Sequence, residues 1–133
     1  MHHNTRPIAG LVGPTMVAIL VSENPWVQPT LYAEQIPPVI YLNGTLMLLG
    51  GLAVVRNHNH WALDGSLPVT LVGWTSIAIG LVRMFLAEGH RAVASTTPDA
   101  AFLAFEIPLL ALALWITWVG YRPLPAPEAP TDR

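Results

Sequence analysis

The sequence predicts an all-α integral membrane protein: an antiparallel four-helix bundle of up-down-up-down topology with both termini on the same side. Two observations lead to this fold class. Hydrophobic residues make up 53% of the 133 residues and charged residues only 11%, whereas about a quarter of an ordinary soluble domain is charged. The apolar residues also fall into four stretches, each near the roughly 20 residues that a helix needs to cross about 30 Å of hydrocarbon.

The four predicted helices cover residues 7–22, 37–56, 67–87 and 100–121. The first is short and carries Pro14, so we expect a kink there; its poor cleavage site argues against a signal peptide. None of the four shows a polar face, which disfavours the alternative of a soluble helical bundle. Residues 1–121 therefore form the predicted transmembrane domain. The proline-rich residues 122–133 are expected to be an extended, disordered tail.

The arginines predict the orientation, because short cytoplasmic loops carry an excess of positive charge. With four crossings, four arginines fall on one side and only Arg91 is clearly on the other; the four are Arg6, Arg56, Arg122 and Arg133. We therefore expect the N- and C-termini and the loop at 57–66 to be cytoplasmic. The acidic segment 22–38 and the loop at 88–99 would lie on the outer side.

Glycines seven residues apart mark the expected packing of the second and third helices. A spacing of seven drifts only about 20° around a helix, so each pair forms one stripe. Membrane helices associate through close contact at such stripes of small residues. We predict tight antiparallel packing through Gly44 and Gly51 on one helix and Gly73 and Gly80 on the other.

The stretch "VVRNHNHWALDG", residues 54–65, is unusually polar for this chain. A metal interpretation would use His58 and His60 with Asp64, joined by His2 and His3 from the same side. However, an H-x-H pair chelates only if the loop is folded for it, so no metal is predicted. The favoured interpretation is a turn anchored at the headgroups by Arg56 and Trp61 and capped by the residues between them. A third is a partner-docking loop of Arg56, His58, His60 and Trp61.

Two charged residues lie inside the apolar stretches. Counting at 1.5 Å per residue from the outer helix ends places Arg83 about 6 Å deep and Glu106 about 9 Å deep, with Asn43 on the same side. Charges within the bilayer are costly, so we expect Arg83, Glu106 and Asn43 to form a paired intramembrane polar cluster. The alternative is that Arg83 extends to the headgroups and Glu106 is protonated.

Residues 38–85 carry a family resemblance. Its motifs are Asn43-Gly44, "GLAVVR" at the end of the second helix, His58-Asn59-x-Trp61, and Leu71-Val72-Gly73-Trp74. In these the chain resembles a group of small four-helix bacterial inner-membrane proteins of unassigned function. The resemblance implies the four-helix fold and a multi-pass location in the bacterial inner (cytoplasmic) membrane, and no activity.

The expected function is that of a non-enzymatic accessory or scaffold subunit of a larger inner-membrane complex. The alternative is a small oligomeric ion, proton or solute transporter that uses the Arg-Glu-Asn cluster. No catalytic motif is present, so neither an enzyme nor a cofactor is predicted. The expected partners are the lipid bilayer and other membrane chains, or further copies of this one. The net charge of −2 and the scattered arginines argue against nucleic acid.

Overall fold

The computed structural model describes residues 5–63 and 66–123, and every regular element in these ranges is an α-helix. It has four long helices, α1 (Thr5–Glu23), α2 (Pro37–Asn57), α3 (Leu67–Phe85) and α5 (Asp99–Tyr121), and a short one, α4 (Ala87–Thr96). All four long helices are long and apolar enough to cross a membrane. The predicted all-α class is therefore confirmed, and the predicted helices differ from the observed ones by at most two residues at either end.

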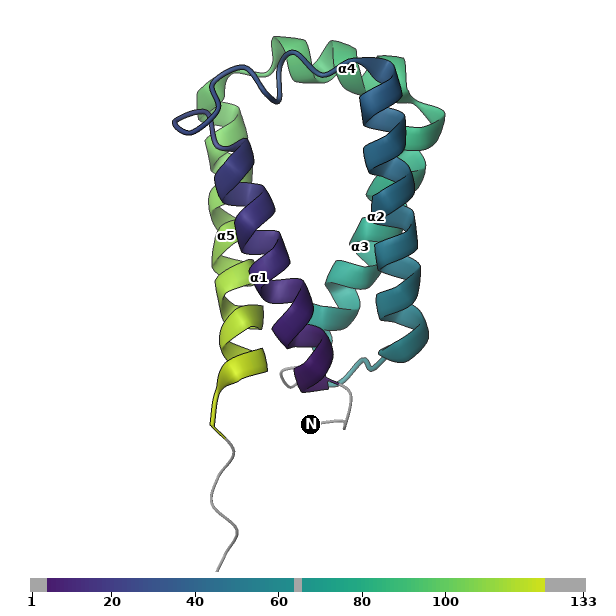
Figure 1. Ribbon diagram of the computed structural model, residues 1–133, viewed down its shortest axis with the longest axis vertical. Helices are drawn as coiled ribbons and strands as arrows, with labels where there is room; N and C mark the ends of the chain where they lie inside the picture. The colour runs from purple at the N-terminus through teal and green to yellow at the C-terminus, as the bar shows by residue number, and fades with distance from the viewer. Residues whose placement is uncertain (1–4, 64–65, 124–133) are drawn as a thin grey trace, which may run out of the picture.

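The long helices are arranged as two antiparallel pairs, and we call each pair a hairpin whether or not its helices are consecutive in the sequence. Figure 1 shows α2 beside α3 and α1 beside α5, and these are the two extensive helix contacts of the molecule. The α2–α3 hairpin consists of neighbours in sequence, whereas α1 and α5 are the first and last helices. Because the helices alternate in direction, α1 begins and α5 ends at the same end of the molecule. We call this the terminal end, and it also holds the turn between α2 and α3.

The hairpins meet through a small apolar core near the terminal end. Its buried residues come from α1, α3 and α5 and are Ala9, Val69, Val72, Ile116 and Val119. Elsewhere the hairpins make few contacts with each other. In the most apolar window of each helix, only 17% of the residues of α1, α2 and α5 and 33% of those of α3 are buried. Most of the apolar helix surface is thus left for lipid or for other chains.

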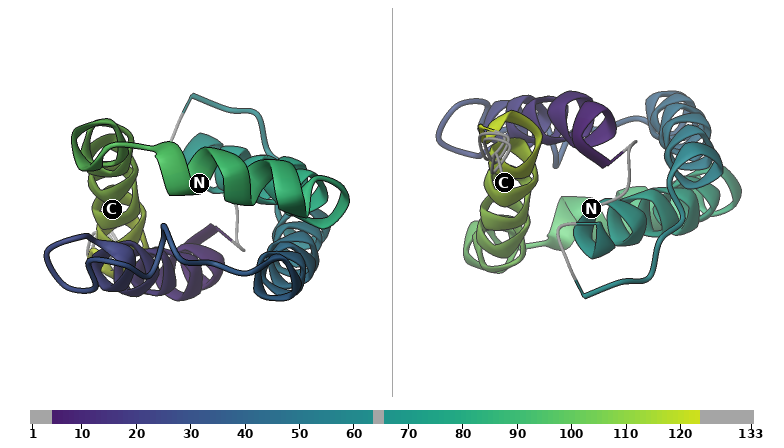
Figure 2. Two further views of the ribbon diagram at one scale, coloured as in Figure 1. Left: turned by 90° about the horizontal axis from the view of Figure 1, so that it is seen from above. Right: turned by 90° about the horizontal axis from the view of Figure 1, so that it is seen from below.

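Helix α4 corrects the expectation of a loop over residues 88–99. Viewed down the bundle in Figure 2, α4 runs across from the end of α3 to the start of α5. Leu86 breaks the helical geometry after α3, with φ −126° and ψ 38°, so the third helix ends at Phe85 and not at residue 87. The alanines of α4 favour a helix up to Thr97. Pro98 then disfavours helical geometry at Thr97, the residue before it. We call the end of the molecule that holds α4 the α4 end.

Prolines and a polar turn set the remaining boundaries. Helix α2 opens on a proline pair at its first positions, where the missing N–H is harmless. After α1, the side-chain oxygen of Asn24 accepts a hydrogen bond of 2.9 Å from the backbone N–H of Trp26, which starts the turns of segment 24–36. Pro14 and Pro108 lie within α1 and α5, and the helix continues through each.

Candidate functional site

The glycines predicted to pack α2 against α3 lie at that contact. A Cβ placed on Gly51 would lie 2.7 Å from the backbone oxygen of Gly73, and one on Gly80 would lie 2.7 Å from that of Gly44. A Cβ on Gly73 would lie 2.9 Å from the side chain of Val54. Contacts this short leave no room for a methyl group, so the two backbones approach as closely as glycine allows.

A second glycine contact, which the sequence did not indicate, joins α1 to α5. A Cβ on Gly13 would lie 2.5 Å from the backbone nitrogen of Thr117, and one on Gly120 would lie 2.5 Å from that of Gly10. At the terminal end, the guanidinium of Arg6 also donates to the backbone oxygen of Arg122. Both hairpins are therefore held together in the same way, by close backbone contact at small residues.

Asn43 and Arg83 are brought together near the α4 end. Arg83 Nη1 donates a hydrogen bond to Asn43 Oδ1 and so links α3 to α2. The close contact at Gly44 makes this possible, because it brings Arg83 and the backbone of α2 within van der Waals distance. The Nε atom of Arg83 is buried without an acceptor in the described part of the chain.

Glu106 has a different partner from the one expected. It is only 4% exposed, and its Oε2 accepts a hydrogen bond of 2.9 Å from Asn24 Nδ2, just after α1. Its Oε1 is buried without a hydrogen bond to any described residue. Among the described residues no ion pair joins Glu106 to Arg83. The expected direct pair is replaced by two amide contacts, one within each hairpin, because the two charges belong to different hairpins.

Two further ionisable residues belong to this region, and the sequence reasoning missed both. Glu23, the last residue of α1, interacts electrostatically with both Arg83 and Glu106. His90 on α4 packs edge-on against the ring of Tyr32, with 6.2 Å between ring centroids. Burial, and to a lesser degree the charge of Arg83, lowers the pKa of His90. Both residues lie outside or at the edge of the predicted apolar stretches, so only a search beyond those stretches could have found them.

We call these six residues the polar cluster: Glu23, Asn24, Asn43, Arg83, His90 and Glu106. Its members come from all five helices and from the turn after α1. It holds two carboxylates and one guanidinium, and an oxygen of Glu106 and the Nε of Arg83 lack partners among the described residues. Buried polar atoms without partners are uncommon and mark places where a proton, water or ligand can bind.

At the terminal end, His58 and His60 fix the turn between α2 and α3. His58 is fully buried, and its Nε2 lies 3.1 Å from the backbone oxygen of Ser66. The backbone N–H of His60 donates to Thr70 Oγ1 at 3.1 Å, and that hydroxyl donates to the backbone oxygen of His60 at 2.9 Å. These bonds tie the turn to the first residues of α3.

Two tryptophans share one acceptor beside this turn. The indole N–H groups of Trp61 and Trp74 both point to Asn59 Oδ1, at 3.0 and 3.3 Å, while Arg56 is exposed.

The rings of His58 and His60 are 5.1 Å apart, and no three described His, Asp or Glu residues are grouped for a metal ion. Asp64, His2 and His3 of the metal interpretation, Arg133 and most of the tail at 122–133 lie outside the described residues.

Comparison with known proteins gives no relative. No protein-family model matches the chain, and neither a curated protein nor a solved structure is significantly similar to it.

Proposed function

We propose that this multi-pass membrane protein is a non-enzymatic accessory or scaffold subunit of a larger complex in the bacterial inner membrane, with both termini cytoplasmic. The observation that carries the proposal is the open arrangement of its two hairpins. Each hairpin is closely packed internally, yet the hairpins contact each other mainly through the small core near the terminal end. Large side chains on every span remain exposed, among them Leu11 at 72% and Phe105 at 69%.

The polar groups within the spans support a scaffold role. Between the polar cluster and the α2–α3 turn, the spans are mainly aliphatic. Hydroxyls in the spans bond to carbonyls of their own helices: Thr15 to Leu11 at 2.8 Å and Thr117 to Ala113 at 2.8 Å. Such bonds satisfy the hydroxyl locally. The two polar ends are thus separated by a largely apolar layer, an arrangement suited to contacts with neighbouring helices.

The proposal is tested by photo-crosslinking in native membranes. A benzophenone amino acid placed at Phe105 in the full chain should yield a discrete adduct with another membrane protein. The same group at the buried Ile116, which packs in the core, is the matched control and should yield none. Extraction in native nanodiscs should recover the same protein together with the chain. Crosslinks to lipid alone at Phe105, Leu11 and Leu49, with a monomer in the nanodisc, would refute the scaffold role.

A second candidate function, transport of protons or small ions by an oligomer, is favoured by one specific observation. The carboxylate of Glu106 is buried at the α4 end with one oxygen unsatisfied by the described residues. Buried ionisable groups in spans are a common element of proton pathways. Proteoliposomes loaded with a pH-sensitive dye should then leak protons, and Glu106→Gln should abolish the leak while Thr45→Ala, a hydroxyl that bonds only its own helix, should preserve it. Equal dye signals from protein-containing and empty liposomes would exclude proton transport.

A further inference from the structure

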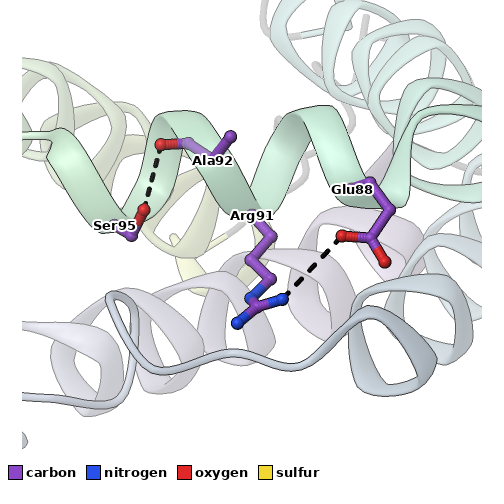
Figure 3. Close-up of polar contacts among 4 residues, drawn as sticks. All are labelled: Glu88, Arg91, Ala92 and Ser95. Atoms are coloured by element: carbon purple, nitrogen blue, oxygen red, sulfur yellow. Dashed lines mark hydrogen bonds and ion pairs between the residues drawn. The ribbon is translucent and has the colours of Figure 1, made fainter.

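A pocket of 480 Å³ opens at the α4 end, and no residue of the polar cluster lines it. It lies between α4 and residues 33–36, the segment that leads into α2, and Figure 3 shows its α4 side. Its charged and polar lining consists of Glu34, Gln35, Glu88, Arg91 and Ser95. The pocket therefore joins one guanidinium and two carboxylates in a single opening at the edge of the predicted membrane spans.

The groups in this pocket retain unused hydrogen-bonding capacity. Arg91 Nη1 lies 3.9 Å from Glu88 Oε2, as drawn in Figure 3, and both side chains are more than half exposed. An exposed ion pair at this distance binds weakly, and Arg91 has no other acceptor among the described residues. On the opposite wall, Gln35 Oε1 is buried without a donor in the same part of the chain. The pocket thus offers donors to an anion and acceptors to a cation.

We propose that this pocket binds the headgroup of a phospholipid that carries a primary ammonium, of the phosphatidylethanolamine class. The guanidinium of Arg91 has the planar fork of N–H groups that binds phosphate. The carboxylates of Glu34 and Glu88 accept hydrogen bonds, and an ammonium has three N–H groups to donate. A trimethylated choline headgroup has none.

Two features favour a lipid as the source of this headgroup. The pocket is continuous with the start of α2, because Ile36 lines it and Pro37 opens the helix. Immediately beyond, Ile36, Val39 and Leu42 are 54%, 50% and 59% exposed, so acyl chains can follow the apolar surface of α2. With two carboxylates against one guanidinium, the pocket itself is negatively charged, which disfavours an anionic lipid such as phosphatidylglycerol.

The test is native mass spectrometry of the delipidated full chain with matched dioleoyl lipids. Phosphatidylethanolamine should bind about tenfold more tightly than phosphatidylcholine, as expected for charge-assisted hydrogen bonds of a partly exposed ammonium. Glu34→Gln should reduce the preference to near unity, whereas Arg91→Gln should weaken the binding of both lipids alike, because both carry the phosphate. Both side chains are exposed, so folding should be unaffected, as the elution volume will show. Asp99→Asn, a carboxylate of the same end that does not line the pocket, is the matched control and should keep the full preference.

Several results would overturn the proposal. Equal affinity for the ethanolamine and choline lipids would show that the ammonium N–H groups are not recognised. Tighter binding of phosphatidylglycerol would show that the pocket selects an anion. Soluble phosphoethanolamine binding as tightly as the lipid would exclude a contribution from the acyl chains. None of these results bears on the scaffold proposal, which depends on the exposed faces of the spans.

Discussion

Two adjacent glycines of α2 test how far the α2–α3 contact stabilises the protein. Gly51 faces α3, and a Cβ there would lie 2.7 Å from Gly73 O and 2.8 Å from Ile77 N. Gly50, one position earlier, would meet nothing within 4 Å. Gly51→Ala should therefore destabilise the protein, and Gly50→Ala serves as its control. Both substitutions raise helix propensity by the same amount, up to about 1 kcal/mol, so this contribution cancels in the comparison.

The size of the effect follows from the geometry. Ordinary van der Waals contact begins near 3.4 Å, whereas the new methyl group would lie 2.7 Å from a backbone atom. Backbone atoms of two helices cannot rotate away, so the helices must separate by about 0.7 Å, the difference between these distances. A gap of that size removes about a third of the dispersion attraction. Over about 40 atom pairs of about 0.15 kcal/mol each, the loss is about 2 kcal/mol, within the about 1–3 kcal/mol typical of overpacked interiors.

The assay is thermal unfolding of the purified chain in detergent, followed by tryptophan fluorescence. A loss of about 2 kcal/mol lowers the Tm of a chain of this size by about 6–10 °C, so Gly51→Ala should melt that far below Gly50→Ala. A difference of less than about 1 °C between the two variants would show that α2 and α3 are not held by close backbone contact. Equal destabilisation by both would show that the effect lies within α2 itself.

Three further predictions use the same protein. Gly13→Ala should lower the Tm because its Cβ would lie 2.5 Å from Thr117 N. Gly10→Ala should not, because its Cβ would lie 3.8 Å from the ring of Tyr121; similar melting of both would refute the α1–α5 contact. Cysteines at Leu63, which is 97% exposed, and at Ser95 should react oppositely with an impermeant maleimide on intact cells, with Ser95 labelled; labelling of Leu63 alone would invert the orientation. The folded state lowers the pKa of His90 below 6.5. The contribution of His90 to stability is therefore complete above pH 6.5 and is lost as the pH falls through the folded pKa. His90→Gln should flatten the loss of stability between about pH 7 and 5, and an unchanged slope of stability against pH would contradict this.

The sequence predicts best what depends on local spacing. The four spans follow from runs of apolar residues, and the α2–α3 contact follows from the separation of seven residues between its glycines. The contact between α1 and α5 through Gly13 and Gly120 could not be found this way, because neither glycine belongs to a repeating stripe and the helices are the first and last of the chain. Its discovery requires knowing which helices are neighbours.

The polar cluster shows a second limit. Counting residues gives the depth of Arg83 and Glu106 but not the direction in which each faces, so their similar depth suggested a pair that the structure does not form. Glu106 instead reaches Asn24 in a turn, a residue that no argument about apolar spans would select. Helix α4 was missed for a related reason, since a ten-residue amphipathic helix is too short and too polar for a search based on membrane spans.

The pairing of the first helix with the last has a consequence for how the protein is made. The α2–α3 hairpin is complete once residue 85 has been synthesised, so it can form while the ribosome is still translating. Helix α1 enters the membrane first but finds its glycine-lined partner only when residues 99–121 have followed. Until then its small-residue face is open to lipid or to other helices. A nascent chain truncated before α5 should consequently be recognised by membrane quality-control proteases through an unpaired α1, while its α2–α3 hairpin is already folded.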